Sequence, residues 1–536
     1  MGDERNCYTE LPTVLCQPQD DCLYLDPPAY KLHVLETGLY QVRYADLLAA
    51  GVPVDVGPGI DPATLQLFSS GAEVAIWVEG GDDASFDPGN AVLFYGEGLD
   101  TRFTGTNVYW LTYGKQDGLR MGGKAGTPSG TAPAPTFFAS TRHLEENRDR
   151  NPRLRMTPEE DNWWWKQVLA PGEPTQAVTF TLPHPAAESY SATLRTDLHG
   201  RLYSNAVDPD HHAQVFLNGH AVDDIWWDGF EDHVSEVSFP SSHLQAGTNI
   251  ITITAPNDTG LGYDAFFVNW FDIDLRTAYE AQDDVLAFTG DEAGIWCYRA
   301  GGFSSPDVDL FDVSDPLKPA RILSTTLLGA SGSYTLTFED AVAQPTRYLA
   351  LTPARRLSPA SIRRDGPSAL RGDGNGADYI AISHADFITE VLPLADYRAA
   401  KGLRSVVVDV QNVYDEFGYG VFDPEAIQRF LAHTYEHWVP PAPSFVLLIG
   451  NGHFDYRGYA STEPNYVPPY MLYIDRDLGE VAADNRYVAI TGDDILPDMR
   501  IGRLPVSSPA ETAVVVDKIL AYEENPPPGD WVWRSV

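Results

Sequence analysis

The chain has 536 residues, of which 43% are hydrophobic and 12% aromatic. These fractions suffice for packed cores and exclude a wholly disordered chain, and the length predicts about three or four domains. Asp and Glu number 76 against 36 Lys and Arg, which gives a formal net charge of −40. Such a field repels phosphate backbones, so nucleic acid is not expected as a partner. It favours cations, with calcium as the obvious candidate.

The first residues contain no apolar core of the kind that a signal peptide needs. Met1 is therefore either an internal start or a fragment boundary, and the sequence leaves both open. No apolar run approaches the roughly 18 residues of a membrane span, so no transmembrane segment is expected.

The chain has four cysteines, and three of them, Cys7, Cys16 and Cys22, lie close together. They are compatible with one disulfide plus a spare thiol, or with part of a pattern that continues upstream. A zinc site is less expected, because no CxxC and no paired His spacing accompanies them. Cys297 lies between two aromatic residues, which indicates a buried structural thiol.

Residues 1–130 are predicted to form a small β-rich N-terminal domain. The segment 30–44 alternates apolar and polar residues around Thr37 and Gly38, which predicts two hairpin strands. The segment 72–99 predicts two more strands around an acidic, Gly-rich loop. No helix is predicted before residue 385.

Residues 131–285 repeat short strands at roughly 8–12-residue spacing, which predicts a β-sandwich or jelly-roll-like domain. Residues 286–372 are predicted to form a β-rich bridging domain and linker. In the sandwich, adjacent Trp226 and Trp227 cannot share one face of a strand. His211 and His212, which follow Asp208 and Asp210, could suggest a metal site, but solvated loop residues are the preferred interpretation.

The pattern changes at residue 373, where a Gly- and Asp-rich linker leads into alternating strands and helices. Apolar runs at 379–383, 406–410 and 445–449 predict buried strands. The segment 387–401 and a segment from Asp423 predict helices between them, and a last helix carries Ser508 as its cap. This order predicts a mostly parallel sheet with right-handed crossovers, so residues 373–536 form an α/β domain.

The stretch "VLLIGNGHFDY" places Asn451, His453 and Asp455 just past a buried strand, where an open α/β sheet builds its site. These residues are candidates for lining a cleft, and the alternative is a tight turn in which the glycines supply positive φ. The set Ser383, His384 and Asp386 resembles a triad only in composition, since neighbours at a strand end rarely align as nucleophile, base and orienting group.

Clustered carboxylates at Asp493, Asp494 and Asp498 could hold a metal ion. Their spacing does not match the EF-hand loop, and exposed acidic turns are common. No cofactor is expected to be required, and structural calcium at these residues is the one candidate.

Residues 378–530 resemble the first part of a gingipain-family cysteine peptidase domain, a relative of the caspase-like proteases. The resemblance rests on "DYIAISHADF", "FVLLIGNGHFDY", "NYVPPY", "DNRYVAITGDDILPDMRIGRLPV" and "AVVVDKILAYEENP" in this order. Upstream segments such as "HHAQVFLNG" and "FVNWFDIDL" resemble the β-rich regions that precede this domain in larger bacterial surface proteins.

The resemblance implies a caspase-like α/β fold that cleaves peptide bonds with a Cys thiolate and a His. The α/β part has no cysteine, and its histidines, His384, His433, His437 and His453, lie outside any His-Gly motif. We therefore expect the catalytic pair beyond residue 536 and assign no catalytic residue.

The expected protein is the N-terminal part of a secreted or surface endopeptidase that acts on protein or peptide substrates. Attachment to the cell surface would run through missing C-terminal regions. The alternatives are a surface binding or adhesion protein on a degenerate peptidase scaffold, or a secretion-linked processing peptidase.

Overall fold

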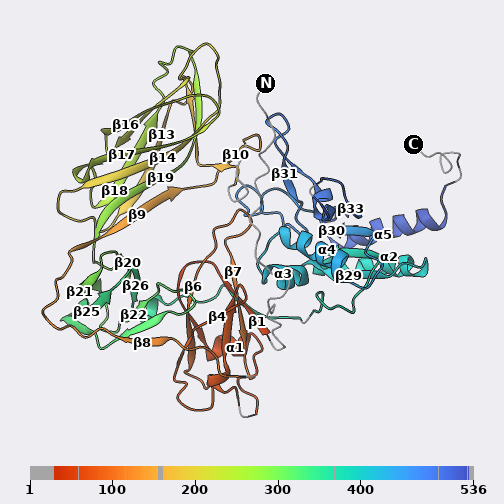
Figure 1. Cartoon of the computed structure of the whole chain (residues 1–536), viewed down its shortest axis with the longest axis horizontal. Helices are drawn as coiled ribbons and strands as arrows, with labels where there is room; N and C mark the ends of the chain where they lie inside the picture. The colour runs from red at the N-terminus through yellow and green to blue at the C-terminus, as the bar shows by residue number, and fades with distance from the viewer. Residues whose placement is uncertain are drawn as a thin grey trace.

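The computed structural model describes residues 29–57, 59–114, 116–154, 161–366, 368–492, 494–527 and 529. Cys7, Cys16, Cys22 and Asp493 lie outside these residues. Three β-rich lobes and one α/β part are arranged side by side (Figure 1). The predicted class is confirmed, because the only all-parallel sheet among the described residues lies in the last third of the chain.

The first β-rich lobe is a pair of sheets closed around one apolar core. One sheet has the order β27-β1-β7-β3-β4 and the other the order β2-β6-β5. The elements are β1 (Ala29–Val34), β2 (Gly38–Arg43), α1 (Tyr44–Ala49), η1 (Pro62–Thr64), β3 (Gln66–Ser69), β4 (Ala72–Val74), β5 (Trp77–Glu79), β6 (Ala91–Gly96), β7 (Asn107–Thr112) and β27 (Ser361–Arg364).

Two expectations for this lobe are corrected. β1 and β2 do not pair with each other, because the short link around Thr37 carries the chain from one sheet to the other. Both strands are needed to cover the core from opposite sides. The prediction of no early helix misses α1, whose single buried side chain, Leu47, gives too little apolar periodicity to detect.

The second lobe is the predicted sandwich. Its sheets have the orders β12-β19-β14-β17, with β9 also paired to β19, and β13-β18-β15-β16. The elements are β9 (Phe137–Glu145), β12 (Lys166–Ala170), β13 (Thr175–Leu182), β14 (Ser191–Gly200), β15 (His211–Leu217), β16 (His220–Trp227), β17 (Asp232–Pro240), η2 (Ser241–His243), β18 (Gly247–Thr254) and β19 (Asp264–Ala278). A short ribbon, β10 (Asp149–Arg150) with β11 (Trp163–Trp164), flanks it.

The histidine pair on β15 is buried, contrary to the expectation of solvated loop residues. His211 stacks on Trp227, and its Nδ1 lies 2.6 Å from a carboxylate oxygen of Asp264. Its Nε2 lies 3.0 Å from the carbonyl oxygen of Gly229. Alternation places Trp227 in the core and leaves Trp226 42% exposed, as the strand pattern predicts.

The third lobe packs against the first. Its sheets have the orders β20-β26-β22-β23-β8 and β21-β25-β24, and an apolar cluster that contains Phe311 and Leu93 joins them to the first lobe. The elements are β8 (Gly122–Ala125), β20 (Val285–Gly290), β21 (Gly294–Phe303), β22 (Asp309–Asp312), β23 (Ala320–Leu323), β24 (Thr326–Ala330), β25 (Ser333–Val342), β26 (Thr346–Leu351) and η3 (Pro353–Arg355). Cys297 on β21 is a buried free thiol, as predicted.

The α/β part has four parallel strands in the order β29-β28-β30-β33. Two apolar clusters, one on each face, show that α3 and α4 cover one side and α2 and α5 the other. The elements are β28 (Tyr379–Ser383), η4 (Ala385–Phe387), α2 (Ile388–Ala400), β29 (Ser405–Asp409), α3 (Val410–Gly418), α4 (Glu425–His437), β30 (Phe445–Ile449), β31 (Met471–Tyr473), β32 (Glu480–Ala482), η5 (Asp484–Val488), β33 (Arg500–Leu504) and α5 (Pro509–Glu524).

A buried ionic cluster joins the β-rich region to the α/β part. Glu480 on β32 forms ion pairs with Arg102 and Arg150, the latter at 2.8 Å, and accepts a hydrogen bond from Asn162 at 2.9 Å. Desolvation lowers the pKa of Arg150 to about 10, with repulsion from Arg102 second. On another face, Lys31 pairs with Asp415 at 2.7 Å.

The helices that the structure describes include none that is both long and apolar enough to cross a membrane.

Candidate functional site

The candidate site lies at the carboxyl ends of the parallel strands. After β28 the chain crosses to β29 on one side, and β30 then adds on the other side of β28. The loops that follow β28 and β30 therefore leave in opposite directions. In open α/β sheets this point is where a binding crevice forms.

The loop after β28 carries His384, whose ring packs against Phe387 and edge-on against Tyr466. The backbone N–H of Asp386 donates to His384 Nδ1 at 3.3 Å. The Ser383 hydroxyl donates instead to the carbonyl oxygen of His384 at 3.0 Å. Ser383, His384 and Asp386 are thus near one another without the nucleophile-to-base hydrogen bond of a triad.

The loop after β30 begins at Gly450, which has a φ of +140°. A Cβ there would lie 2.8 Å from the Cβ of Tyr466, so this position requires glycine. Asn451 follows, with its backbone N–H bonded to the carbonyl oxygen of Val506 at 2.8 Å. Asn451 is exposed at the end of the strand.

His453 is held by the loop through both ring nitrogens. Nε2 lies 2.8 Å from the carbonyl oxygen of Glu463, and Nδ1 accepts from the backbone N–H of Asp455 at 3.2 Å. In this arrangement neither nitrogen is available to take a proton from a substrate.

Asp455 is 1% exposed, and its carboxylate organises the turn that follows it. It accepts backbone hydrogen bonds from Tyr459, Ala460 and Ser461 at 2.7–2.9 Å. The same turn lines a cavity of about 440 Å³ that also receives Phe103 from the first β-rich lobe. Asp455 therefore shapes a cavity wall, and its oxygens already have backbone partners.

The acidic cluster predicted to bind a metal is only partly described. Asp498 accepts hydrogen bonds from the N–H groups of Ile490 and Thr491 at 2.7 and 2.8 Å and from the Thr491 hydroxyl. The hydrogen bonds from Thr491, and then that from Ile490, lower its pKa. Asp494 accepts from the backbone N–H of Leu496 at 2.8 Å. Within the described ranges, no group of three or more His, Cys, Asp or Glu is placed to hold a metal ion.

Sequence reasoning missed Arg503, which holds the loop after β30 in place. Its guanidinium donates to the carbonyl oxygens of Gly450 at 2.8 Å and Val467 at 2.6 Å, and pairs with Asp484 at 2.7 Å. The available signal was an arginine inside a short apolar strand, a position that demands several acceptors.

Known proteins are similar to this chain in the sequence of its α/β part and in the fold of most of its length. Residues 373–536 match the sequence model of peptidase family C25. No curated protein matches the chain.

Among solved structures, dimeric latent PorU from Porphyromonas gingivalis is similar over 95% of this chain and 50% of that one. The TM-score is 0.67 and the identity 17%. The chain thus spans half the length of PorU, and at this identity the likeness shows the fold. A structure described as a protease has a TM-score of 0.20, at 24% identity, over 28% of this chain and 29% of that one.

Proposed function

We propose that the chain is the N-terminal part of a gingipain-like cysteine endopeptidase, because residues 373–536 match the sequence model of peptidase family C25. The observation that carries the proposal is the parallel sheet whose loops after β28 and β30 diverge at its carboxyl edge. That edge offers Asn451 to a bound ligand and a loop fixed by Arg503. Both are suited to holding a peptide in a defined position.

The proposed chemistry is attack of a thiolate on a peptide carbonyl, with a His as base and backbone N–H groups stabilising the oxyanion. Residues 373–536 contain no cysteine, and Cys297 is 5% exposed on β21, in a different lobe. We place the nucleophile and its base outside these 536 residues, and the described residues supply the scaffold of the cleft.

We also propose that the protein acts outside the cell or on its surface. The acidic composition and the resemblance of the β-rich region to parts of bacterial surface proteins support this location. Structural calcium at Asp494 and Asp498 stays a prediction, which melting curves in calcium and in a chelator would test.

A cleavage assay of the purified chain tests the functional proposal. With a casein substrate and a library of fluorogenic peptides, we expect no cleavage that depends on a reduced thiol. The Cys297→Ala variant is the matched control and should behave identically. Thiol-dependent cleavage by this chain, abolished in Cys297→Ala or in a variant of Cys7, Cys16 or Cys22, would overturn the placement of the nucleophile.

A further inference from the structure

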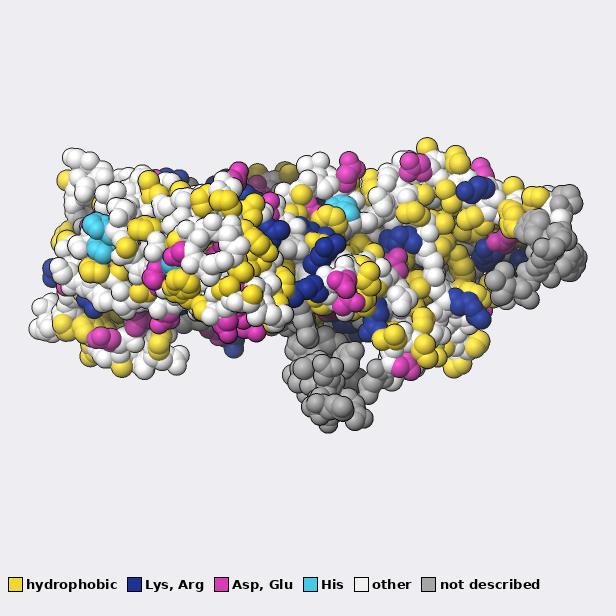
Figure 2. Space-filling view, turned by 90° about the horizontal axis from the view of Figure 1, so that it is seen from above, with side chains coloured by type: hydrophobic (Ala, Val, Ile, Leu, Met, Phe, Trp, Pro, Cys, Tyr) yellow, Lys and Arg dark blue, Asp and Glu magenta, His cyan; other side chains and the backbone are white. Residues whose placement is uncertain are grey.

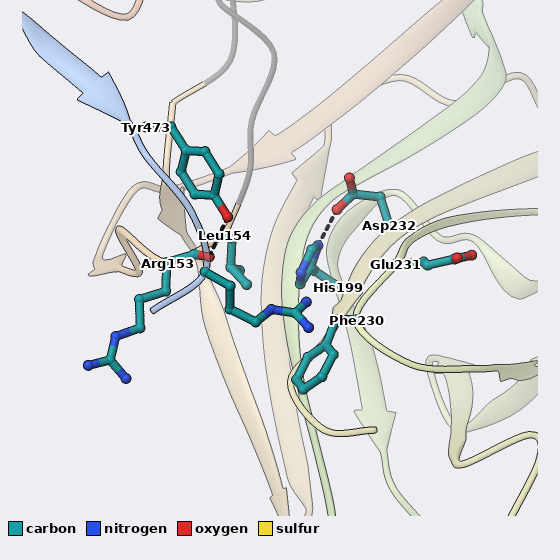
Figure 3. A pocket seen from close by; sticks show the side chains of 8 residues that line it. Arg153, Leu154, His199, Phe230, Glu231, Asp232 and Tyr473 are labelled. Atoms are coloured by element: carbon teal, nitrogen blue, oxygen red, sulfur yellow. Dashed lines mark hydrogen bonds and ion pairs between the residues drawn. The ribbon is translucent and has the colours of Figure 1, made fainter. Parts of the chain in front are cut away.

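A second cavity, remote from the parallel sheet, lies where the sandwich meets the β31–β32 hairpin. Its volume is about 530 Å³. Figure 3 shows side chains from the sandwich on one side, and on the other side chains from the hairpin and from Arg153 and Leu154, which follow β10. The lining residues are Arg153, Leu154, His199, Phe230, Glu231, Asp232, Tyr473 and Arg476.

His199 on β14 gives this cavity a buried polar atom without a partner. The residue is 3% exposed, and its ring packs against Trp164 at a centroid distance of 5.1 Å. Nδ1 is hydrogen-bonded to the carboxylate of Asp232 (Figure 3). Nε2 is buried and has no hydrogen-bond partner among the described residues. Buried polar atoms are almost always paired, so a ligand that reaches this atom would gain a hydrogen bond.

The cavity lining carries two arginines, Arg153 and Arg476, and two carboxylates, Glu231 and Asp232. The guanidinium of Arg476 lies over Phe230, whereas that of Arg153 points away from the His199 ring in Figure 3. Asp232 is engaged by His199, and the side chain of Glu231 points away from the His199 ring in Figure 3. Figure 2 shows Lys and Arg side chains gathered near the middle of the molecule.

We propose that this cavity binds an organic carboxylate. The guanidinium of Arg476 lies 3.5 Å from the ring centroid of Phe230, which leaves its N–H groups to form the fork that fits a carboxylate. The imidazole of His199 would meet the same ligand through Nε2, and Leu154 and Tyr473 would contact its carbon skeleton. Cavities of roughly 300–1,000 Å³ hold small organic ligands, which makes a bare inorganic ion a poor fit.

A sugar acid and the free C-terminus of a peptide share this chemistry, and the experiment separates them. The proposal does not depend on peptidase activity, because every residue involved lies outside the parallel sheet. Such a ligand would touch both the sandwich and the hairpin of the α/β part.

The test measures binding to the full 536-residue chain by ligand-observed NMR at constant ionic strength. The probes are sodium glucuronate and N-acetyl-glycylglycine, with glucose and N-acetyl-glycylglycinamide as their uncharged counterparts. We expect saturable binding of at least one carboxylate and none of its uncharged counterpart. Binding of glucuronate identifies a sugar acid as the ligand, and binding of N-acetyl-glycylglycine identifies the free C-terminus of a peptide.

Arg476→Gln should weaken this binding at least about tenfold, as expected for loss of a charge-assisted hydrogen bond. Because Arg476 is exposed at a hairpin tip, the variant should keep its melting temperature. Arg355→Gln removes an exposed charge from η3, outside the cavity lining, and should bind like the parent chain. His199→Gln should weaken binding as well.

Three results would overturn the proposal. These are the absence of saturable binding by both carboxylates, equal binding of the uncharged counterparts, and unchanged affinity in a folded Arg476→Gln variant.

Discussion

At the scale of single residues, Arg503 is the side chain on which the shape of the candidate site depends most. Its side chain is 15% exposed, and it pairs with Asp484 and donates to the carbonyl oxygens of Gly450, Val467 and Pro468. We predict that Arg503→Gln destabilises the chain by about 3 kcal/mol, because it leaves a largely buried carboxylate without its cation. Chemical denaturation measures this loss.

Arg500 lies on the same strand and is exposed. Its guanidinium lies over the ring of Phe445. Arg500→Gln is therefore the control, and we expect a change within about 0.5 kcal/mol. Equal effects of the two substitutions would show that Arg503 does not hold the loop.

His143 is a second residue whose behaviour follows from its contacts. Hydrogen bonds to Glu145 and Asp272 raise its pKa to about 9, against an opposing effect of burial. A raised pKa means that the folded state binds the proton more tightly. The contribution of this protonated ring to the free energy of unfolding is therefore fully present below about pH 6.5 and is lost as the pH rises through about 9.

An NMR titration of the His143 ring should give a midpoint near that value, and Asp272→Asn should lower it. A midpoint at or below about 6.5 in the parent chain would contradict the described contacts.

At the scale of elements, α3 is a helix that the sequence pattern did not predict. The apolar run at 406–410 predicts a buried strand, yet the strand ends at Asp409 and a helix begins at Val410. Asp409 accepts from the backbone N–H of Gln411 at 2.9 Å and caps this helix. Val410, Val413, Tyr414 and Phe417 then form its buried face, a helical spacing concealed by the preceding valines.

We predict that Asp409→Ala costs about 1 kcal/mol through loss of the N-cap. Asp396→Ala, at an exposed position inside α2, is the matched control and should be near neutral. Urea denaturation of both variants distinguishes the cap from a general effect of removing a carboxylate.

Other elements followed directly from local patterns. Ser508 caps α5 by accepting from the backbone N–H of Glu511 at 3.2 Å, as the sequence indicated. Asn451, His453 and Asp455 were correctly placed beyond a buried strand. Their hydrogen-bond partners could not be predicted, because Glu463 and the turn after Asp455 approach them only through the folded loop.

At the scale of the whole molecule, Glu480 links the β-rich region to the α/β part. Removing its charge would leave Arg102 and Arg150 without their carboxylate in a largely buried cluster. We predict that Glu480→Gln destabilises the contact by about 3 kcal/mol and exposes new protease sites at residues 145–154 and 161–165. Limited proteolysis of Glu480→Gln measures this effect, with Glu188→Gln, a substitution at an exposed site, as the control. Identical digestion patterns of the two variants would contradict the prediction.

The central proposal is that residues 373–536, which match peptidase family C25, form part of a peptidase scaffold whose nucleophile lies outside the 536 residues. The most direct test treats the native gene product with a peptidyl chloromethyl ketone and locates the alkylated cysteine by mass spectrometry. We predict a single labelled cysteine outside these residues, with labelling prevented by prior blocking of the thiol. Labelling of Cys297, Cys7, Cys16 or Cys22, or no labelled cysteine at all, would contradict the claim.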